Sequence, residues 1–327
     1  DGFTQGTGFV IAPTSANPYS LSGLTENTDY DFYVRAICAV GDSSTWSGPF
    51  SFSTLIGSNT PCVGGFAGVY PCDNYDLQGH LTLAEMGASG GVEGNDIWGW
   101  TDPLDYKEYA IFGMTNGTAF VDVSDPLNPR YLGKLPTHSS SNIWRDMKVY
   151  NNYAFIVADN VGSHGMQVFD LTLLRNVVTP QTFTNTAHYS GVGSAHNIVI
   201  NEATGFAYIV GSNQNSGGLH FVNIQNPLAP VVAGGFSADG YTHDAQVVVY
   251  NGPDVTYQGL EIAFASNEDT FTIVDVDDKL DPQQISRTGY AGSSYAHQGW
   301  VTEDHQFFLM NDEFDEQNYA HNTRTYI

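Results

Sequence analysis

Basic residues are scarce in this chain. Only 10 of its 327 residues are Lys or Arg, whereas 35 are Asp or Glu, so the formal net charge is −25. A surface of that sign repels phosphate backbones and anionic lipid headgroups. The composition therefore argues against nucleic acid and membrane-surface partners, and it makes divalent cations the natural counterions.

Several common sequence signals are missing as well. The chain contains no apolar run of about eighteen residues, so we expect no membrane insertion within it. It begins at Asp1 without Met or a signal peptide, in the middle of an expected domain, and we expect a fragment whose targeting information is missing. A Gly-x-Ser-x-Gly elbow, a phosphate-binding Gly loop, a Cys-x-x-Cys pair and a His-Glu-x-x-His helix are also absent. We therefore assign no catalytic residue.

Cysteine occurs only three times. Cys62 and Cys72 flank a Gly-rich turn that can bring their sulfurs together, and closing so short a loop stabilises a chain by roughly 2–3 kcal/mol. We expect a Cys62–Cys72 disulfide and hence an oxidising compartment. Cys38 is left over, as a buried thiol or with a partner upstream. Because only 14% of the residues are charged and 35 are Gly, we expect an extracellular or cell-surface protein.

What the chain does contain is a short phrase that recurs five times. The copies begin at Asn95, Arg145, His196, His243 and His297, which lie 50, 51, 47 and 54 residues apart. A repeat of that length, rich in strand-forming residues, is typical of a β-propeller or a solenoid. We expect each copy to be the innermost strand of one sheet.

Two further strands follow each phrase. The second strands are expected at Tyr109–Gly113, Tyr153–Val157, Phe206–Val210, Glu261–Ala265 and Gln306–Met310. The third strands are expected at Ala119–Val123, Gln167–Leu171, His220–Ile224 and Thr272–Val276, with a weaker fourth strand after each. Three to four strands in a unit of about fifty residues match a propeller blade. The fold class expected is therefore all-β, with a β-propeller of five visible blades.

Residues 1–55 carry a different pattern. Strands are expected at Gly8–Ile11, Leu21–Thr25, Tyr30–Ala36 and Phe50–Thr54, and the alternation of Tyr30, Phe32 and Val34 predicts that one face is buried. The stretch resembles the C-terminal half of a fibronectin type III domain, a β-sandwich. That resemblance rests on Leu24, a tyrosine-corner residue at Tyr30, and the segments Tyr33–Ala36 and Trp46–Pro49. We expect a partial domain at 1–55, followed by a linker at 56–75 that holds the disulfide.

The repeat itself resembles a known family. The third-strand phrase with an Asp-Pro turn, as in Ser124–Pro126, is similar to the LVIVD-type repeat. With Gly68–Cys72 and Tyr75–Leu81, the region from Cys62 onward resembles the bacterial surface family called choice-of-anchor B. The resemblance implies an exported protein of the Bacteroidetes type. It also implies a propeller at 76–327 that is incomplete at its C-terminus and belongs to about seven blades in all.

The start of an inner strand lies beside the central channel, so equivalent positions of successive blades form rings. The first ring is Asn95, Arg145, His196, His243 and His297, and the next residues are Asp96, Asp146, Asn197, Asp244 and Gln298. Another ring follows the second strands, at Asn116, Asn160, Asn213, Glu268 and Glu313. Because neighbouring strand residues point to opposite faces, we expect only one of the first two rings to aim inward.

Three imidazoles beside carboxylates are candidate metal ligands. His196, His243 and His297, with Asp244 and Glu313, could hold a divalent metal such as calcium, zinc or manganese. Further binding positions are assigned to Asn95, Arg145, Asp146, Asn197, Glu268 and Gln298. The alternative, which we favour, is that the repeated polar residues form a hydrogen-bond network between strands and turns.

Other polar residues are given structural roles. Asp122, Asp170, Asn223 and Asp275 recur in the third strands and are expected to cap the turn that follows. The acidic run Asn311–Glu316 is expected to be a solvated loop rather than a calcium loop. Five histidines share no register and are expected on the surface, namely His138, His164, His188, His305 and His321.

Three functions remain open. The one favoured is a secreted or cell-surface binding protein whose partner is an extracellular protein, a glycan or a metal-bridged ligand. The second is a metal-dependent polysaccharide lyase or hydrolase, with the three histidines holding the ion and Glu313 or Asp244 as base. The third is an architectural module of a surface fibre. The net charge of −25 disfavours a polyanionic substrate for the enzyme.

Overall fold

The computed structural model describes residues 8–11, 13–15, 21, 24–25, 28–39, 41–54, 59–320, 322 and 324–327. It divides into two compact units, which are described separately. The first comprises Asp1–His80 with Asp125–Pro129, and the second comprises Leu81–Ser124 with Arg130–Ile327. Strands make up nearly all of the regular structure in both units, as an all-β chain requires.

The described residues of the first unit form three antiparallel strand pairs. Strand β1 (Asp29–Val34) pairs with β4 (Ser47–Ser53), β2 (Ile37–Ala39) with β3 (Asp42–Ser43), and β5 (Phe66–Ala67) with β6 (Tyr70–Pro71). The Tyr30 hydroxyl accepts a hydrogen bond of 2.8 Å from the Thr25 backbone N–H. That contact to a backbone group just upstream is the geometry of a tyrosine corner.

Some expectations for this unit are wrong or lie outside the described residues. Residues 8–11 form no strand. The strand expected at Leu21–Thr25 lies partly outside the described residues, as do residues 56–58 of the expected linker. The predicted buried face of β1 is wrong, because Phe32 and Val34 are 44% and 50% exposed. In the described part of the unit, β1 pairs only with β4.

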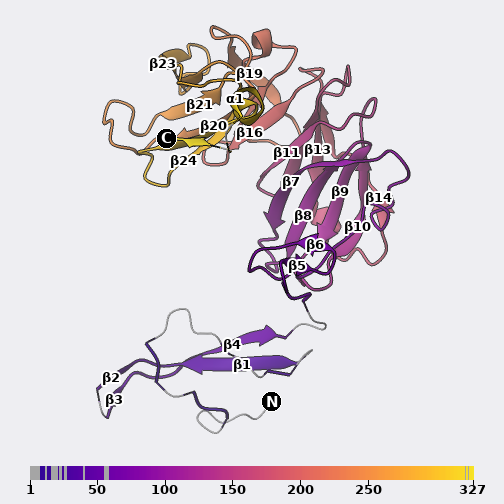
Figure 1. Cartoon of the computed structure of the whole chain (residues 1–327), viewed down its shortest axis with the longest axis vertical. Coiled ribbons are helices and arrows are strands. Elements are labelled where there is room, and N and C mark those ends of the chain that lie inside the picture. Colours follow the sequence, from indigo (N-terminus) through magenta and orange to yellow (C-terminus); the bar gives the residue numbers. More distant parts are fainter. Residues whose placement is uncertain are drawn as a thin grey trace. The chain divides into compact units, whose positions relative to one another are not determined.

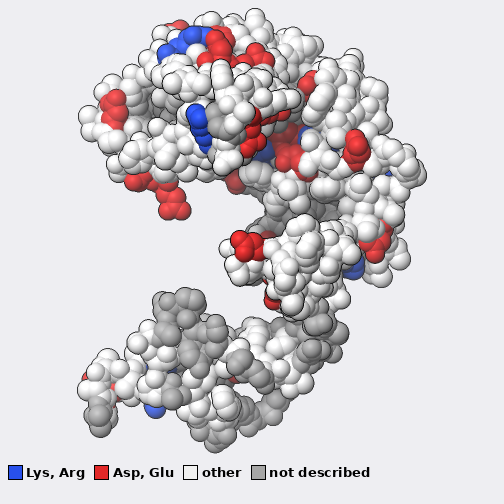
Figure 2. All heavy atoms as spheres, in the orientation of Figure 1, with Lys and Arg blue, Asp and Glu red and all other residues white. Residues whose placement is uncertain are grey.

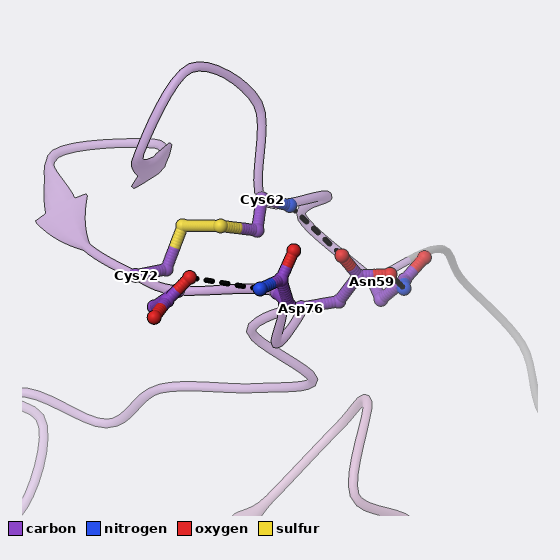
Figure 3. Close-up of a disulfide and its surroundings, with 6 residues drawn as sticks. Asn59, Cys62, Cys72 and Asp76 are labelled. Carbon is purple, nitrogen blue, oxygen red and sulfur yellow. Dashed lines mark hydrogen bonds between the residues drawn. A yellow bond between two sulfur atoms is a disulfide. The ribbon is translucent and has the colours of Figure 1, made fainter.

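The predicted disulfide between Cys62 and Cys72 is confirmed, with Cα atoms 5.9 Å apart. Figure 3 shows Asp76 beside it, accepting a 2.8 Å hydrogen bond from the Cys62 backbone N–H and a second bond from the Asn59 side chain. One carboxylate thus ties the start of the disulfide loop to the chain that leaves it. Cys38 is an exposed free thiol, so the expectation of a buried one is wrong.

Where the structure describes it, the second unit contains five sheets in sequence order, here called sheets I to V. Sheet I contains β7 (Gly94–Thr101), β8 (Glu108–Met114), β9 (Gly117–Asp122), β10 (Arg130–Pro136) and β14 (Gln181–Thr182). Sheet II contains β11 (Arg145–Tyr150), β12 (Tyr153–Ala158), β13 (Met166–Asp170) and β15 (Ala187–Tyr189), with the 3-10 turn η1 (Leu171–Leu174). Within each sheet, consecutive strands pair antiparallel, except that β14 joins β10 in parallel.

The remaining sheets repeat the pattern. Sheet III contains β16 (Asn197–Asn201), β17 (Phe206–Val210), β18 (Leu219–Asn223) and β19 (Val231–Phe236), with η2 (Asn215–Gly217). Sheet IV contains β20 (Asp244–Val249), β21 (Glu261–Ser266), β22 (Phe271–Asp275) and β23 (Gln283–Thr288). Sheet V contains β24 (Ala296–Val301), β25 (Phe308–Asp312) and β26 (Thr325–Tyr326), with the short helix α1 (Asp315–Tyr319).

The five sheets stand around their inner strands. Figure 1 shows β7, β11, β16, β20 and β24 along the inner side of an arc, while β14, β19 and β23 lie at its outer edge. Each inner strand contacts the inner strand of the next sheet. The all-β, propeller-like arrangement predicted from the fifty-residue repeat is therefore confirmed.

Apolar side chains fill the spaces between successive sheets. Between sheets I and II, the rings of Phe120 and Phe169 stack with centroids 4.5 Å apart, and Phe183 packs against both. Similar buried clusters join sheets II and III, through Phe155 and Ile209, and sheets III and IV. Because the middle sheets are packed on both faces, the sequences of their strands are almost continuously apolar.

The predicted caps after the third strands are confirmed. In each case the side-chain oxygen accepts a hydrogen bond of 2.9–3.1 Å from the backbone N–H two residues later. The four acceptors are Asp122, Asp170, Asn223 and Asp275. These are Asx turns, which reverse the chain without needing any ion.

Candidate functional site

A cavity of about 1000 Å³ lies at the centre of the arc. All five sheets contribute to its lining, through residues at the start of their inner strands. Two groups of polar side chains in this lining are closely packed. The imidazole group is His196, His243, His297 and Glu313, and the carboxylate group is Asp96, Asp146, Asp244 and Lys148.

The imidazole group is closely packed. The ring centroids of His196 and His243 lie 4.3 Å apart, and those of His243 and His297 lie 4.4 Å apart. The Nε2 atom of His297 is 3.7 Å from the Glu313 carboxylate. His243, His297 and Glu313 each offer a ligand atom within 4.8 Å of the other two. The structure therefore brings together three of the residues predicted as metal ligands, with His196 alongside.

Hydrogen bonds orient two of these rings. The Nδ1 atom of His243 lies 3.0 Å from the backbone oxygen of His297, so it must carry the proton and donate it. The Nδ1 atom of His196 lies 3.0 Å from a carboxylate oxygen of Asp159 and donates in the same way. In both residues the Nε2 atom is left as the nitrogen available to another partner.

His243 and His297 are held in the neutral form. Burial, and then the neighbouring imidazoles of His196 and His297, lower the pKa of His243 to about 3. Burial also lowers the pKa of His297, against the opposing effect of Glu313. His243 is only 7% exposed, which agrees with a strong desolvation effect. At neutral pH both side chains are uncharged imidazoles.

The carboxylate group is built around Lys148. Its ammonium lies 2.6 Å from Asp146 and 4.5 Å from the centre of the Trp98 ring. Asp146 is 2% exposed and also accepts a 2.8 Å hydrogen bond from the Ile198 backbone N–H of sheet III. Although burial raises it, the charge of Lys148 holds the pKa of Asp146 below its usual value.

Two further carboxyls share that single cation. Burial, followed by the interaction with Asp146, raises the pKa of Asp96 to about 7. Burial and the charge of Asp146 likewise raise the pKa of Asp244 to about 7. Because one ammonium cannot neutralise three carboxylates, two of them take up protons near neutral pH.

The expectation that only one of the two inner rings faces the cavity is wrong. Both His196 and Asn197 line it, as do both His243 and Asp244. His196 and His243 precede the first residues of β16 and β20, so strict alternation does not apply to them. In sheet V, the register of β24 shifts between Ala296 and Gln298, which has a similar effect at His297.

The other predicted binding residues have varied positions. The side-chain amides of Asn95 and Asn197 donate to the backbone oxygens of Arg145 and His243 in the next sheet, at 3.0 and 2.9 Å. These bonds are the inter-sheet links expected of a structural network. Gln298 is exposed in the cavity wall, whereas Glu268 and Arg145 are not among the lining residues. Arg145 is 1% exposed and donates to the Met114 backbone oxygen at 3.2 Å.

Two expectations about other polar residues are wrong. His164 is fully buried rather than exposed, and its Nε2 atom lies 3.2 Å from the Arg145 guanidinium. The acidic run Asn311–Glu316 is not a solvated loop, because its first residues belong to β25 and its last to α1. Asp312 there is 7% exposed and accepts hydrogen bonds from the backbone N–H groups of Ser294 and Tyr295. In both cases the partners lie at least seventeen residues away in the sequence, where a local pattern could not show them.

Burial of His164 should make the folded protein sensitive to acid. Desolvation lowers the pKa of His164 to about 4 from 6.5, so the unfolded chain takes up this proton first as the pH falls. Stability from this residue is complete above pH 6.5 and is lost towards pH 4, by about 3 kcal/mol. Urea unfolding of the parent and of His164→Gln between pH 7.5 and 4.5 measures this loss of unfolding free energy. We expect the parent to lose more than the variant, and an equal loss in both would contradict the assignment.

The sequence pattern missed several lining residues. Trp144, Tyr241 and Tyr295 face the cavity, as does Asp159. Trp144 stands one residue before a repeated phrase, and the two tyrosines stand two residues before one. Extending the repeat upstream by two residues would have found all three aromatic side chains. Asp159 directly precedes the predicted ring position Asn160, so extending that second ring upstream would have found it.

The lining is predominantly acidic. Carboxylates come from Asp96, Asp146, Asp159, Asp244 and Glu313, against the one ammonium of Lys148. Figure 2 shows acidic side chains gathered over the inner strands near β11 and β16. Among the described residues, the helices are all too short to span a lipid bilayer, so helical membrane insertion finds no support there.

Comparison with known proteins gives only remote similarities. No family model matches the chain, and no curated protein is similar to it. A protein of unknown function from Desulfotomaculum acetoxidans is 13% identical, with a TM-score of 0.49, and the match covers 69% of this chain and 65% of that protein's chain. The β-propeller domain of Cps50 (Swd1) from Myceliophteria thermophila is 13% identical, with a TM-score of 0.41, and the match covers 68% of this chain and 63% of that one. The Dos1 propeller matches 73% and 56% at 12% identity, with a TM-score of 0.42. The chain spans less than two thirds of each of these structures.

Proposed function

We propose that this chain is an extracellular binding protein that holds a glycan in its central cavity. The observation that carries the proposal is the cavity itself, which measures about 1000 Å³ and draws its lining from five sheets. Ligand sites of this kind combine aromatic surface with a few polar groups that fix orientation. Both kinds of group are present at the starts of the inner strands.

Trp144 supplies the main aromatic surface. It is 46% exposed within the cavity wall, and its ring centroid lies 6.4 Å from that of His196. Tyr241 and Tyr295 add two more aromatic rings. An aromatic face can cover the apolar face of a sugar ring, while the neighbouring carboxylates and imidazoles accept hydrogen bonds from hydroxyl groups. This combination suits a saccharide better than a wholly apolar ligand.

The charge of the lining selects among saccharides. Even when Asp96 and Asp244 are protonated, three carboxylates remain against one ammonium, so the potential in the cavity is negative and favours neutral or amino-bearing sugars over uronic acids. The same charge disfavours a lyase for acidic polysaccharides. A metal-dependent hydrolase for neutral saccharides is the second candidate, because His243, His297 and Glu313 are grouped as a metal site requires. Release of reducing ends from the bound saccharide would favour that candidate.

The cellular setting forms part of the proposal. The Cys62–Cys72 disulfide and the net charge of −25 support a secreted or cell-surface protein. We propose membership of the choice-of-anchor B family, an LVIVD-repeat propeller at 76–327 after a partial fibronectin type III domain at 1–55, from a Bacteroidetes-type bacterium. The tyrosine-corner bond of Tyr30 supports the fibronectin assignment.

Binding to a saccharide panel tests the proposed function. We expect the full chain to bind neutral or amino-sugar oligosaccharides in calorimetry and to ignore oligogalacturonates. Trp144→Ala should weaken binding about tenfold, which corresponds to 1.4 kcal/mol. The matched control is Tyr106→Ala, since Tyr106 is 79% exposed and lies outside the cavity lining. Preference for the polyanion, or equal affinity in Trp144→Ala and the parent, would overturn the proposal.

A further inference from the structure

We infer that His243, His297 and Glu313 form a binding site for a first-row transition metal ion at the wall of the central cavity. Their ligand atoms all lie within 4.8 Å of one another. Two imidazoles and one carboxylate are a set that binds zinc, iron, cobalt or manganese. This site does not require the bound ligand to be a glycan, so it can be tested without any saccharide.

The site is oriented by its surroundings before any ion arrives. The backbone N–H of His243 donates to the Ser266 oxygen at 2.9 Å, and its Nδ1–H donates to the His297 oxygen at 3.0 Å. A ligating histidine commonly donates its other ring N–H to a carbonyl or carboxylate, which fixes the tautomer. The Nε2 lone pair of His243 is thereby left free for a metal ion.

Glu313 and His297 reach the site from two strands of sheet V. His297 lies in β24 at its register shift, and Glu313 directly follows β25, with its backbone N–H donating to the Tyr295 oxygen at 3.0 Å. The 3.7 Å between His297 Nε2 and the Glu313 carboxylate is longer than a hydrogen bond. Small side-chain movements about these fixed backbones would let both atoms contact one ion.

The donor set selects among cations. Calcium takes six to eight oxygen ligands, whereas two imidazole nitrogens favour zinc and other transition metals. We therefore exclude calcium from the three metals expected from the sequence. With three protein ligands, a bound ion would keep at least one coordination position for a hydroxyl or carboxylate of a ligand in the cavity.

His196 and Asp244 are placed outside the ligand set. His196 is not a member of the compact group, although its ring centroid lies 4.3 Å from that of His243. Its Nδ1–H is donated to Asp159, and its ring lines the cavity next to the site. Asp244 belongs to the carboxylate group and accepts a 2.8 Å hydrogen bond from the Ala245 backbone N–H.

Metal titration of the full chain tests the inference. The protein is stripped with a chelator and titrated with Zn²⁺, Co²⁺ and Ca²⁺, with calorimetry for affinity and the Co²⁺ absorption spectrum for the ligand type. We expect a single Zn²⁺ or Co²⁺ per chain, bound far more tightly than Ca²⁺. His297→Ala and Glu313→Gln should each weaken Zn²⁺ binding more than about 100-fold, because even the loss of an outer partner costs 10–100-fold.

The variants are chosen so that folding does not obscure the result. The side chains of His297 and Glu313 are 30% and 39% exposed, so their replacement should leave the metal-free unfolding midpoint near that of the parent. His305→Ala is the matched control, because His305 lies outside the cavity lining, where its Nδ1 accepts a hydrogen bond from Asn251. Absence of stoichiometric Zn²⁺, equal affinity in both ligand variants and the parent, or Ca²⁺ binding as tight as Zn²⁺ would each overturn the inference.

Discussion

Replacing Asp146 by Ala should destabilise the second unit by about 3 kcal/mol or more. Asp146 is 2% exposed, neutralises Lys148 at 2.6 Å and accepts the Ile198 backbone N–H at 2.8 Å. The substitution leaves a buried ammonium without its partner and a buried N–H without its acceptor, and such losses cost about 3–5 kcal/mol. The loss should fall at the lower end, because Asp96 and Asp244 also attract Lys148 and can replace part of the lost charge.

Urea unfolding at pH 7.5 measures this loss. The matched control is Asp105→Ala, which removes an exposed carboxylate 3.7 Å from Lys107, and it should cost less than about 1 kcal/mol. Asp146→Asn keeps a hydrogen-bond acceptor for the Ile198 backbone N–H, so its loss of unfolding free energy should lie between those of Asp146→Ala and Asp105→Ala. If Asp146→Ala cost no more than Asp105→Ala, the buried carboxylate could not be the link that joins sheets II and III.

Replacing Phe169 by Ala should cost about 3–5 kcal/mol. The side chain is fully buried, stacks on Phe120 with ring centroids 4.5 Å apart and packs against Phe183 at 5.1 Å. Removing it leaves a cavity between sheets I and II and also abolishes two aromatic contacts. Because the ring belongs to the interface between the sheets, both sheets should become less stable together.

Guanidinium unfolding followed by tryptophan fluorescence measures this second loss, because Trp98 and Trp100 lie in sheet I. Phe307→Ala serves as control, since Phe307 is 54% exposed and its loss should change the unfolding free energy by less than about 0.5 kcal/mol. If the unfolding free energy of Phe169→Ala changed as little as that of the control, the packing around Phe169 could not hold sheets I and II together.

The repeat explains why much of the fold could be predicted. Copies spaced by about fifty residues give each sheet the same order of strands, and the Asx turns after the third strands recur at the same position. The disulfide could be predicted for a similar reason, because Cys62 and Cys72 are close in sequence. Local spacing thus carried these predictions.

The candidate site could be predicted only in part. The phrase identified His243 and His297 as equivalent positions, and the second-strand ring identified Glu313. Strand periodicity, however, predicted that only one of the two rings of inner-strand residues faces the cavity, whereas residues of both rings do. The periodicity could not show that His196 and His243 precede the first residues of their strands. The burial of His164 was missed because its partner Arg145 lies in a separate element, strand β11.

Residue order alone thus specified the all-β class, the repeated sheets, the turn caps and the strong negative charge, because these depend on local pattern and composition. Which side chains meet was decided only by packing. The Nδ1–H of His243 has its acceptor in the next sheet, and Asp146 binds a backbone N–H of a neighbouring sheet. A spacing of fifty residues places such groups on equivalent strands, but the depth of each side chain depends on the register shifts and contacts between adjacent sheets.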